Sequence, residues 1–334
     1  MFKKAWMLCI IPFSIGVYAE PQHILRYSES NSKISDMDTV EYKYTNDGRA
    51  YTEVVYKEGI VERRFTNKYK SIETNISKDD TIIGARLEEA SSLGKNEKYA
   101  KINLIRSKKA LGGDLYYGVS YDDYVAKGAQ NLNEESLSVL IEHEKELPVK
   151  NAEVSVTNTI EVGVKKVKNY LLSELSRDNW SAYNIKLDIV KKMGDYILTA
   201  HLGAQKAYGD IPYVKRYFSS NSVNDFFRSI KSSPDSIYAG FKVAAPVKEI
   251  YNSIYVEPYF GYDAEYEVGG SSKTLMNTGF VGVKGKVSED TTIGLGYEMI
   301  FNENKVNDMD HRVVLYVNHV YKKWIFVNEY RELI

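Results

Sequence analysis

The chain has 334 residues, and its 44 basic and 45 acidic side chains leave a formal net charge of −1. This balance argues against nucleic acid or an anionic membrane surface as a partner, because both attract strongly basic proteins. Cys9 is the only cysteine. It lies in a segment that we expect to be removed, so disulfides, thiol catalysis and thiolate metal sites are excluded from the mature chain.

The first residues have the pattern of a secretory signal peptide, predicted as residues 1–19. Lys3 and Lys4 precede an apolar run that ends in Val17-Tyr18-Ala19, with small residues before the cut. The run is too short to span a bilayer, so we predict cleavage after Ala19 and export of the rest. Residues 20–37 are polar and are predicted to form a short N-terminal tether.

Strand-like runs separated by turn signals fill the rest of the chain, which predicts a single all-β domain over residues 38–334. Three stretches have apolar residues at helical spacing, at 133–147, 169–178 and 222–231, and predict short helical pieces in loops. The candidate strands are 39–45, 50–57, 60–69, 81–89, 98–107, 114–124, 153–165, 181–191, 195–206, 236–247, 253–265, 276–287, 291–301, 311–321 and 323–331.

Alternation of apolar and polar residues is clearest near the C-terminal end. Ile293, Leu295, Tyr297 and Met299 place apolar side chains on one face of a strand, and small or polar residues separate them. A sheet with one apolar and one polar face can cover a soluble core, or it can close into a barrel with lipid outside and water inside. The export signal and the 28 tyrosines, which suit strands and membrane–water interfaces, favour the barrel.

The predicted connections alternate between short and long in the C-terminal half. Transmembrane barrels have short periplasmic turns and long outer loops, so this pattern supports an antiparallel transmembrane β-barrel. An even strand count is the bacterial rule and gives about 14 strands, with about 12 and about 16 left open. A short turn near residue 322 conflicts with the rule, because the last strand would then end at the outer rim.

Extrapolating the alternation places eight charged residues on the inner face of the predicted barrel. Both signs are represented, so the lumen should hold water and pass small polar solutes with only a mild charge preference. The alternative is that these residues form the solvated face of a soluble sheet. The candidate lumen residues are Glu161, Lys186, Asp188, Lys242, Glu257, Asp263, Lys284 and Glu298.

No motif predicts a catalytic, cofactor or metal site. The five histidines show no metal-ligand spacing with a third partner, and no glycine-rich phosphate loop is present. Asp308, Asp310 and His311 cluster in a predicted outer loop, and some outer-membrane proteases place such residues at the barrel rim. A rim-active hydrolase is therefore a less favoured alternative. We predict no enzyme activity, no cofactor and no bound metal.

The segments Ile293-Gly-Leu-Gly-Tyr-Glu-Met-Ile300 and Val256-Glu-Pro-Tyr-Phe-Gly-Tyr262, together with the export signal, resemble a Gram-negative outer-membrane β-barrel. In size the chain is similar to porins of the outer membrane protein G and oligogalacturonate-porin type. The resemblance implies a passive channel for small hydrophilic solutes, including oligosaccharides. It implies no substrate-binding residue.

The resulting prediction is a porin-like diffusion channel in the outer membrane of a Gram-negative-type bacterium. Its expected partners are outer-membrane lipid and small hydrophilic solutes, without nucleic acid, and a monomer or a trimer is left open. The alternative from another class is a non-conducting barrel or exported β-protein that serves adhesion or envelope structure.

Overall fold

The computed structural model describes residues 22–31, 35–46, 50–61, 65–92, 95–128, 131–169, 174–210, 212, 235–251, 254–267, 274–302 and 309–333. The predicted signal peptide and the predicted helix at 222–231 lie outside these residues. All regular elements in the described part are strands. They are β1 (Gln22–Asn31), β2 (Ser35–Asn46), β3 (Ala50–Val61), β4 (Phe65–Lys78), β5 (Thr81–Ser92), β6 (Lys95–Ala110), β7 (Gly113–Lys127), β8 (Leu132–Leu147), β9 (Ala152–Asn169), β10 (Glu174–Met193), β11 (Tyr196–Gly209), β12 (Ser236–Ala244), β13 (Lys248–Tyr251), β14 (Ile254–Glu267), β15 (Thr274–Ser288), β16 (Thr291–Asn302), β17 (Met309–Tyr321) and β18 (Trp324–Leu333).

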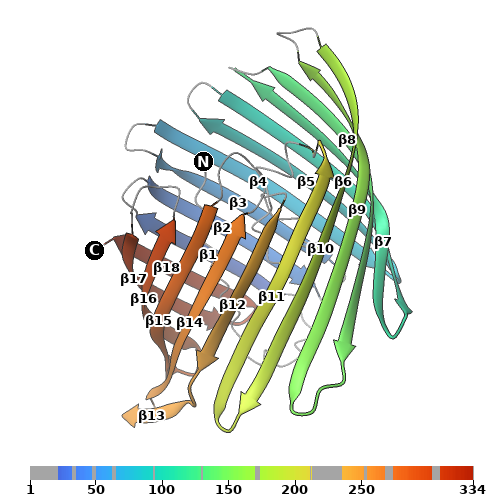
Figure 1. Ribbon diagram of the computed structural model, residues 1–334. Coiled ribbons are helices and arrows are strands. Elements are labelled where there is room, and N and C mark those ends of the chain that lie inside the picture. Colours follow the sequence, from blue (N-terminus) through green and yellow to red (C-terminus); the bar gives the residue numbers. More distant parts are fainter. Residues whose placement is uncertain are drawn as a thin grey trace.

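The strands form one closed sheet in which each strand pairs with its neighbours in sequence, and β1 closes the ring by pairing with β18 (Figure 1). Strands β12 and β13 both pair with β14, at different parts of its length, and so share one position. Pro246 lies between them and has no N–H for the ladder, which explains the interruption. The barrel therefore has 17 strand positions.

The closing pair is parallel, whereas the other pairs are antiparallel. This follows from the odd count, because a ring of antiparallel neighbours returns to its first strand in the same direction only when the number is odd. The predicted count of about 14 is wrong for this reason: the even-number rule assumes that every junction is antiparallel. The conflict at the turn near residue 322 disappears, because β18 then ends at the opposite rim from the start of β1.

Two predicted helices are also wrong. Residues 133–147 belong to β8, and the described residues of 169–178 belong to the end of β9 and the start of β10. Leu137 and Ile141 are four residues apart, a spacing that puts side chains on one face of either a helix or a strand. Val139 lies between them and is exposed on the same face, which only a strand allows. In the described part of the chain no helix is long and apolar enough to cross a membrane.

Two strands lie in segments for which the sequence predicted other structure. Strand β8 replaces the predicted helix, and β1 occupies most of the predicted tether at 20–37. The candidate strand 60–69 spans the turn between β3 and β4. These positions, together with the parallel closure, account for the difference between the predicted and the observed ring.

The two faces of the sheet differ sharply. One face carries exposed large apolar side chains, and because strands alternate, these lie on the outside of the closed barrel. The opposite, inner face carries most of the buried charged and polar residues. The outward apolar residues include Val54, Ile72, Ile76, Ile83, Leu87, Ile102, Leu104, Val119, Leu137, Val139, Ile160, Val162, Leu202, Phe260, Val281, Leu295 and Leu315.

Candidate functional site

The inner wall of the barrel is the candidate site, and it has two contrasting regions. We name the inward side chains of β2–β9 the charged wall and those of β10–β17 the glycine–aromatic wall. The assignment follows from the strand register, which brings inward residues of neighbouring strands directly opposite one another.

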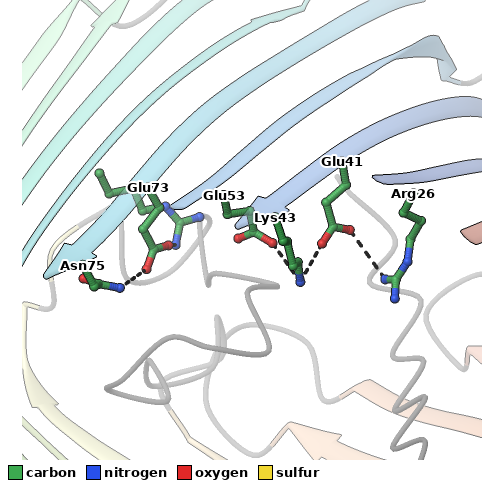
Figure 2. A network of polar contacts seen from close by, with 7 residues as sticks. Arg26, Glu41, Lys43, Glu53, Glu73 and Asn75 are labelled. Carbon is green, nitrogen blue, oxygen red and sulfur yellow. Dashed lines mark hydrogen bonds and ion pairs between the residues drawn. The ribbon is translucent and has the colours of Figure 1, made fainter. Parts of the chain in front are cut away.

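The charged wall begins with a row of alternating charges that extends onto β1 (Figure 2). Lys43 Nζ lies 2.5 Å from Glu41 Oε1 and 2.9 Å from Glu53 Oε1. Arg26 reaches the other oxygen of Glu41 at 3.5 Å. Lys43 and Glu53 are buried, and a buried charge is tolerated only when it is paired and hydrogen-bonded. The positive and negative charges within this row therefore balance one another.

A second group of the same kind follows on β4 and β5. Arg86 Nη1 lies 3.5 Å from Glu73 Oε2, and its Nη2 contacts Glu88. Asn75 donates a hydrogen bond of 3.1 Å to Glu73, and Figure 2 shows this contact beside the first row. Glu73 and Glu88 are both buried. The guanidinium of Arg86 thus forms ion pairs with two buried carboxylates.

Hydroxyl groups complete the charged wall on β6–β9. Tyr99 donates a hydrogen bond of 2.5 Å to Asp122. Ser138 donates to Glu161 at 2.6 Å, and Thr159 donates to Glu142 at 3.0 Å. These carboxylates are buried, so their negative charge is held by donors from the wall itself.

The glycine–aromatic wall is built from rings that lie directly opposite glycines on the next strand. The pairs are Tyr238 with Gly203, Tyr259 with Gly282, Phe280 with Gly261, and Tyr316 with Gly294. A Cβ atom at these glycines would lie 2.2, 2.6, 2.3 and 1.7 Å from the paired ring. The rings therefore lie flat over the glycine backbone, where any side chain would exclude them.

Part of this wall is less enclosed than the charged wall. Tyr259, Phe280 and Tyr316 are half-buried, whereas Tyr99 and Tyr124 of the charged wall are 7% and 1% exposed. The ring centroids of Tyr259 and Phe280 are 6.4 Å apart. Partly accessible aromatic faces can stack against the apolar face of a small molecule.

Charged groups surround these rings. Lys242 Nζ lies 4.6 Å from the centroid of Tyr259, within the range of a cation–π contact. Lys284 Nζ lies 2.7 Å from Glu257 Oε1. Glu298 Oε2 is 3.8 Å from Arg331 Nε. The region thus combines apolar ring faces with both signs of charge at their edges.

The eight residues predicted to line a lumen all lie on the inner face. Lys242, Glu257, Lys284 and Glu298 surround the rings described above. Lys186 Nζ pairs with Asp188 Oδ1 at 2.6 Å, one strand away from the contact of His201 with Asp263 at 3.4 Å. Glu161 belongs to the charged wall instead. The structure therefore spreads them over both regions, and their role in solute passage stays a prediction.

Sequence reasoning missed most of the ion pairs on the inner face, although a signal was present. Opposite charges two residues apart on one strand share a face and can pair. Five such pairs on the inner face are joined by ion pairs. They are Glu41 with Lys43, Arg86 with Glu88, Lys186 with Asp188, Asp310 with Arg312, and Glu329 with Arg331.

The predicted rim cluster does not come together. Asp310 is buried on the inner face and is 3.1 Å from Arg312 Nη2. His311 is the next residue, so it points to the other face, where its Nδ1 contacts the hydroxyl of Tyr297. Asp308 lies outside the described residues. Among the described residues, no group of three acidic, histidine or cysteine side chains could hold a metal ion.

The comparison with solved structures returns outer-membrane receptors. The ferripyoverdine receptor of Pseudomonas aeruginosa has a TM-score of 0.45 and 10% identity, and the match covers 91% of this chain and 54% of the receptor. The siderophore receptor PirA of the same organism has a TM-score of 0.43 and 9% identity, with 90% and 68% covered. The alcaligin receptor FauA of Bordetella pertussis has a TM-score of 0.43 and 10% identity, with 94% and 61% covered.

These comparisons concern the fold. The chain spans between about half and two thirds of the length of these receptors. No protein-family model and no curated protein matches the sequence. The fold is an outer-membrane β-barrel that resembles receptors, and the comparison does not bear out the porin type. The prediction of a passive diffusion channel is contradicted at this point: the solved structures found include a siderophore receptor, an alcaligin receptor and a copper transporter.

Proposed function

We propose that this protein is an outer-membrane uptake barrel that binds its solute on the glycine–aromatic wall before the solute passes. The single observation that carries the proposal is the group of half-buried rings of Tyr259, Phe280 and Tyr316, held flat over glycines and bordered by charged groups. A surface of this kind offers a small molecule both stacking and charge-assisted hydrogen bonds.

The chemistry of the wall indicates the class of solute. Flat rings favour a molecule with one apolar face, and the neighbouring Lys242, Lys284, Glu257 and Glu298 favour polar groups along its edge. Ring-shaped polar molecules and metal chelates with aromatic or hydroxamate groups both meet this description. One receptor in the comparison is described as bound to ferripyoverdine, so ferric chelates belong in the test beside ring-shaped polar molecules.

The proposal is tested by separating binding from general permeability. The mature chain is purified in detergent, and binding of a panel of sugars and ferric chelates is measured by calorimetry. The same protein is reconstituted into liposomes, and swelling is followed in iso-osmotic solutions of sugars of increasing size. We expect saturable binding of one class and little general swelling.

Two results would contradict the proposal. Rapid swelling that depends only on solute size would show an unselective pore. Saturable binding that is unchanged when Tyr259 and Phe280 are both replaced by Leu would place the binding site elsewhere. The matched control replaces Tyr99 by Phe, which removes a hydroxyl from the charged wall and leaves the proposed binding surface intact.

A further inference from the structure

The outer surface carries a basic pair immediately beyond its apolar band. On β9 the exposed residues Ile160, Val162 and Val164 face outward, with exposed fractions of 47%, 47% and 52%. Lys166 is the next outward residue and is exposed. Arg177 on β10 lies directly opposite Lys166 and is exposed too. The two cations therefore lie side by side at the edge of the surface that contacts lipid acyl chains.

Like charges directly opposite one another destabilise a pair of strands. The cost is offset when an anion bridges the two side chains, because Lys and Arg both donate strong hydrogen bonds to phosphate oxygens. Lys168 is a further exposed, outward basic residue one step along β9. The three basic side chains thus gather where lipid headgroups begin, beside the outward carboxylates of Glu135 on β8 and Asp123 on β7. A local group of cations can bind an anion even though the whole chain is nearly neutral.

The position of this pair in the barrel indicates which leaflet it meets. The connections at this end of the strands include 170–173, 210–235, 268–273 and 303–308. At the other end most connections have two residues, such as those between β6 and β7 and between β17 and β18. Long connections mark the outer side of such barrels, so Lys166 and Arg177 meet the outer leaflet.

We propose that Lys166 and Arg177, together with Lys168, bind the phosphate groups of a phosphorylated glycolipid in the outer leaflet. The acyl chains of that lipid would pack along Ile160, Val162 and Val164 below. Both parts of the partner are thus matched: apolar side chains meet its chains, and basic side chains meet its phosphates. The site is on the outer surface and does not depend on the proposed solute-binding function.

Glu135 provides an internal check on this inference. It lies on β8 directly opposite Lys166, on the side away from Arg177. If the basic pair served only to balance this carboxylate, removing the carboxylate by Glu135→Gln would destabilise the protein. If the pair binds phosphate, Glu135 repels the ligand, and Glu135→Gln should strengthen binding.

The experiment uses the full mature chain, purified and delipidated in detergent. Retention of diphosphoryl lipid A is measured by native mass spectrometry and compared with the same lipid after its phosphates are removed, and with phosphatidylglycerol. The Lys166→Gln/Arg177→Gln variant is compared with a control, Arg106→Gln/Lys108→Gln, which removes two exposed outward cations from the end with short turns.

We expect the unmodified chain to retain the phosphorylated lipid preferentially. The Lys166/Arg177 variant should bind it roughly thirtyfold more weakly, since each cation near a lipid surface contributes about 1 kcal/mol. The control variant should bind it normally, and Glu135→Gln should bind it more tightly. Equal retention of phosphatidylglycerol or of the dephosphorylated lipid, an equal loss in the control, or weaker binding by Glu135→Gln would overturn the proposal.

Discussion

The charged wall and the glycine–aromatic wall solve the same structural problem in different ways. Both are inner faces of one sheet and must be compatible with a polar interior. The charged wall fills its surface with ionised groups that pair with one another, as in the row from Arg26 to Glu53. The other wall has ion pairs as well, such as Lys284 with Glu257, but it also uses glycines, so that rings such as Tyr316 lie against the backbone. The first arrangement leaves little binding capacity for a solute, whereas the second leaves ring faces partly accessible.

The largest expected effect is in the charged wall. Arg86→Met leaves the carboxylates of Glu73 and Glu88 buried without their shared cation. Breaking such a group destabilises a protein by about 3–5 kcal/mol. The loss is measured by urea unfolding of the folded barrel in detergent, followed by the electrophoretic shift between folded and unfolded forms. Arg86→Lys keeps the charge and should lose less than half as much; equal losses would show that charge pairing does not stabilise this wall.

A smaller loss is expected from steric conflict in the glycine–aromatic wall. Gly294→Ala places a Cβ atom on the ring of Tyr316 and should destabilise the barrel by about 1–3 kcal/mol. Removing the ring in Gly294→Ala/Tyr316→Ala should restore part of that loss. Gly279→Ala is the control, because the nearest atom to its Cβ is 3.9 Å away. Additive losses in the double variant would argue against the ring–glycine contact.

The third prediction separates binding from stability. Tyr259→Leu removes a ring from the proposed binding surface and should weaken solute binding by roughly two- to twelvefold, because aromatic stacking contributes about 0.5–1.5 kcal/mol. Tyr99→Phe should instead leave binding unchanged and lower stability by about 1–3 kcal/mol, since it removes a donor from the buried Asp122. Calorimetry and urea unfolding of both variants check the contrast. If Tyr99→Phe also weakens binding, the two walls do not have separate roles.

The smallest effect is expected at an exposed ion pair. Lys109 Nζ lies 2.6 Å from Asp114 Oδ1 beside the turn between β6 and β7, and its side chain is 82% exposed. Exposed pairs contribute about 0.2–1 kcal/mol and are screened by salt. Lys109→Met should therefore leave the free energy of unfolding almost unchanged, and the small difference should shrink further in concentrated salt. A loss as large as that of Arg86→Met would contradict the importance of burial.

The sequence predicted the fold class because the outward alternation is local. Ile293, Leu295, Tyr297 and Met299 show it within one strand, and the barrel confirms it. The strand count was missed because β1 and β8 were predicted as a tether and a helix, and because the even-number rule excludes a parallel pairing such as that between β1 and β18. The prediction of a helix at 133–147 was wrong because apolar residues four positions apart share one face in a helix and also in a strand.

The alternation of residues along the strands predicted only part of the candidate site. Parity along a strand indicates which residues share a face, so the inward positions of Glu257 and Lys284 could be proposed. Which inward residues meet depends on register across strands, as in the contact of Arg86 with Glu73. The glycine–aromatic pairs are of the same kind: Tyr316 and Gly294 lie on different strands and become partners only once β16 and β17 are aligned in this register.

The parallel junction between β1 and β18 also has a consequence for the order of folding. Each antiparallel pair joins strands that follow one another in the chain, so most of the barrel can form by successive local hairpins. The seam pairs His23 with Trp324 and ends with Ser30 beside Arg331, about 300 residues apart in sequence. Closure of such a distant pair carries the largest loss of chain entropy. We therefore expect the seam to be the last junction to form, and its eight residue pairs to govern the rate of the final step.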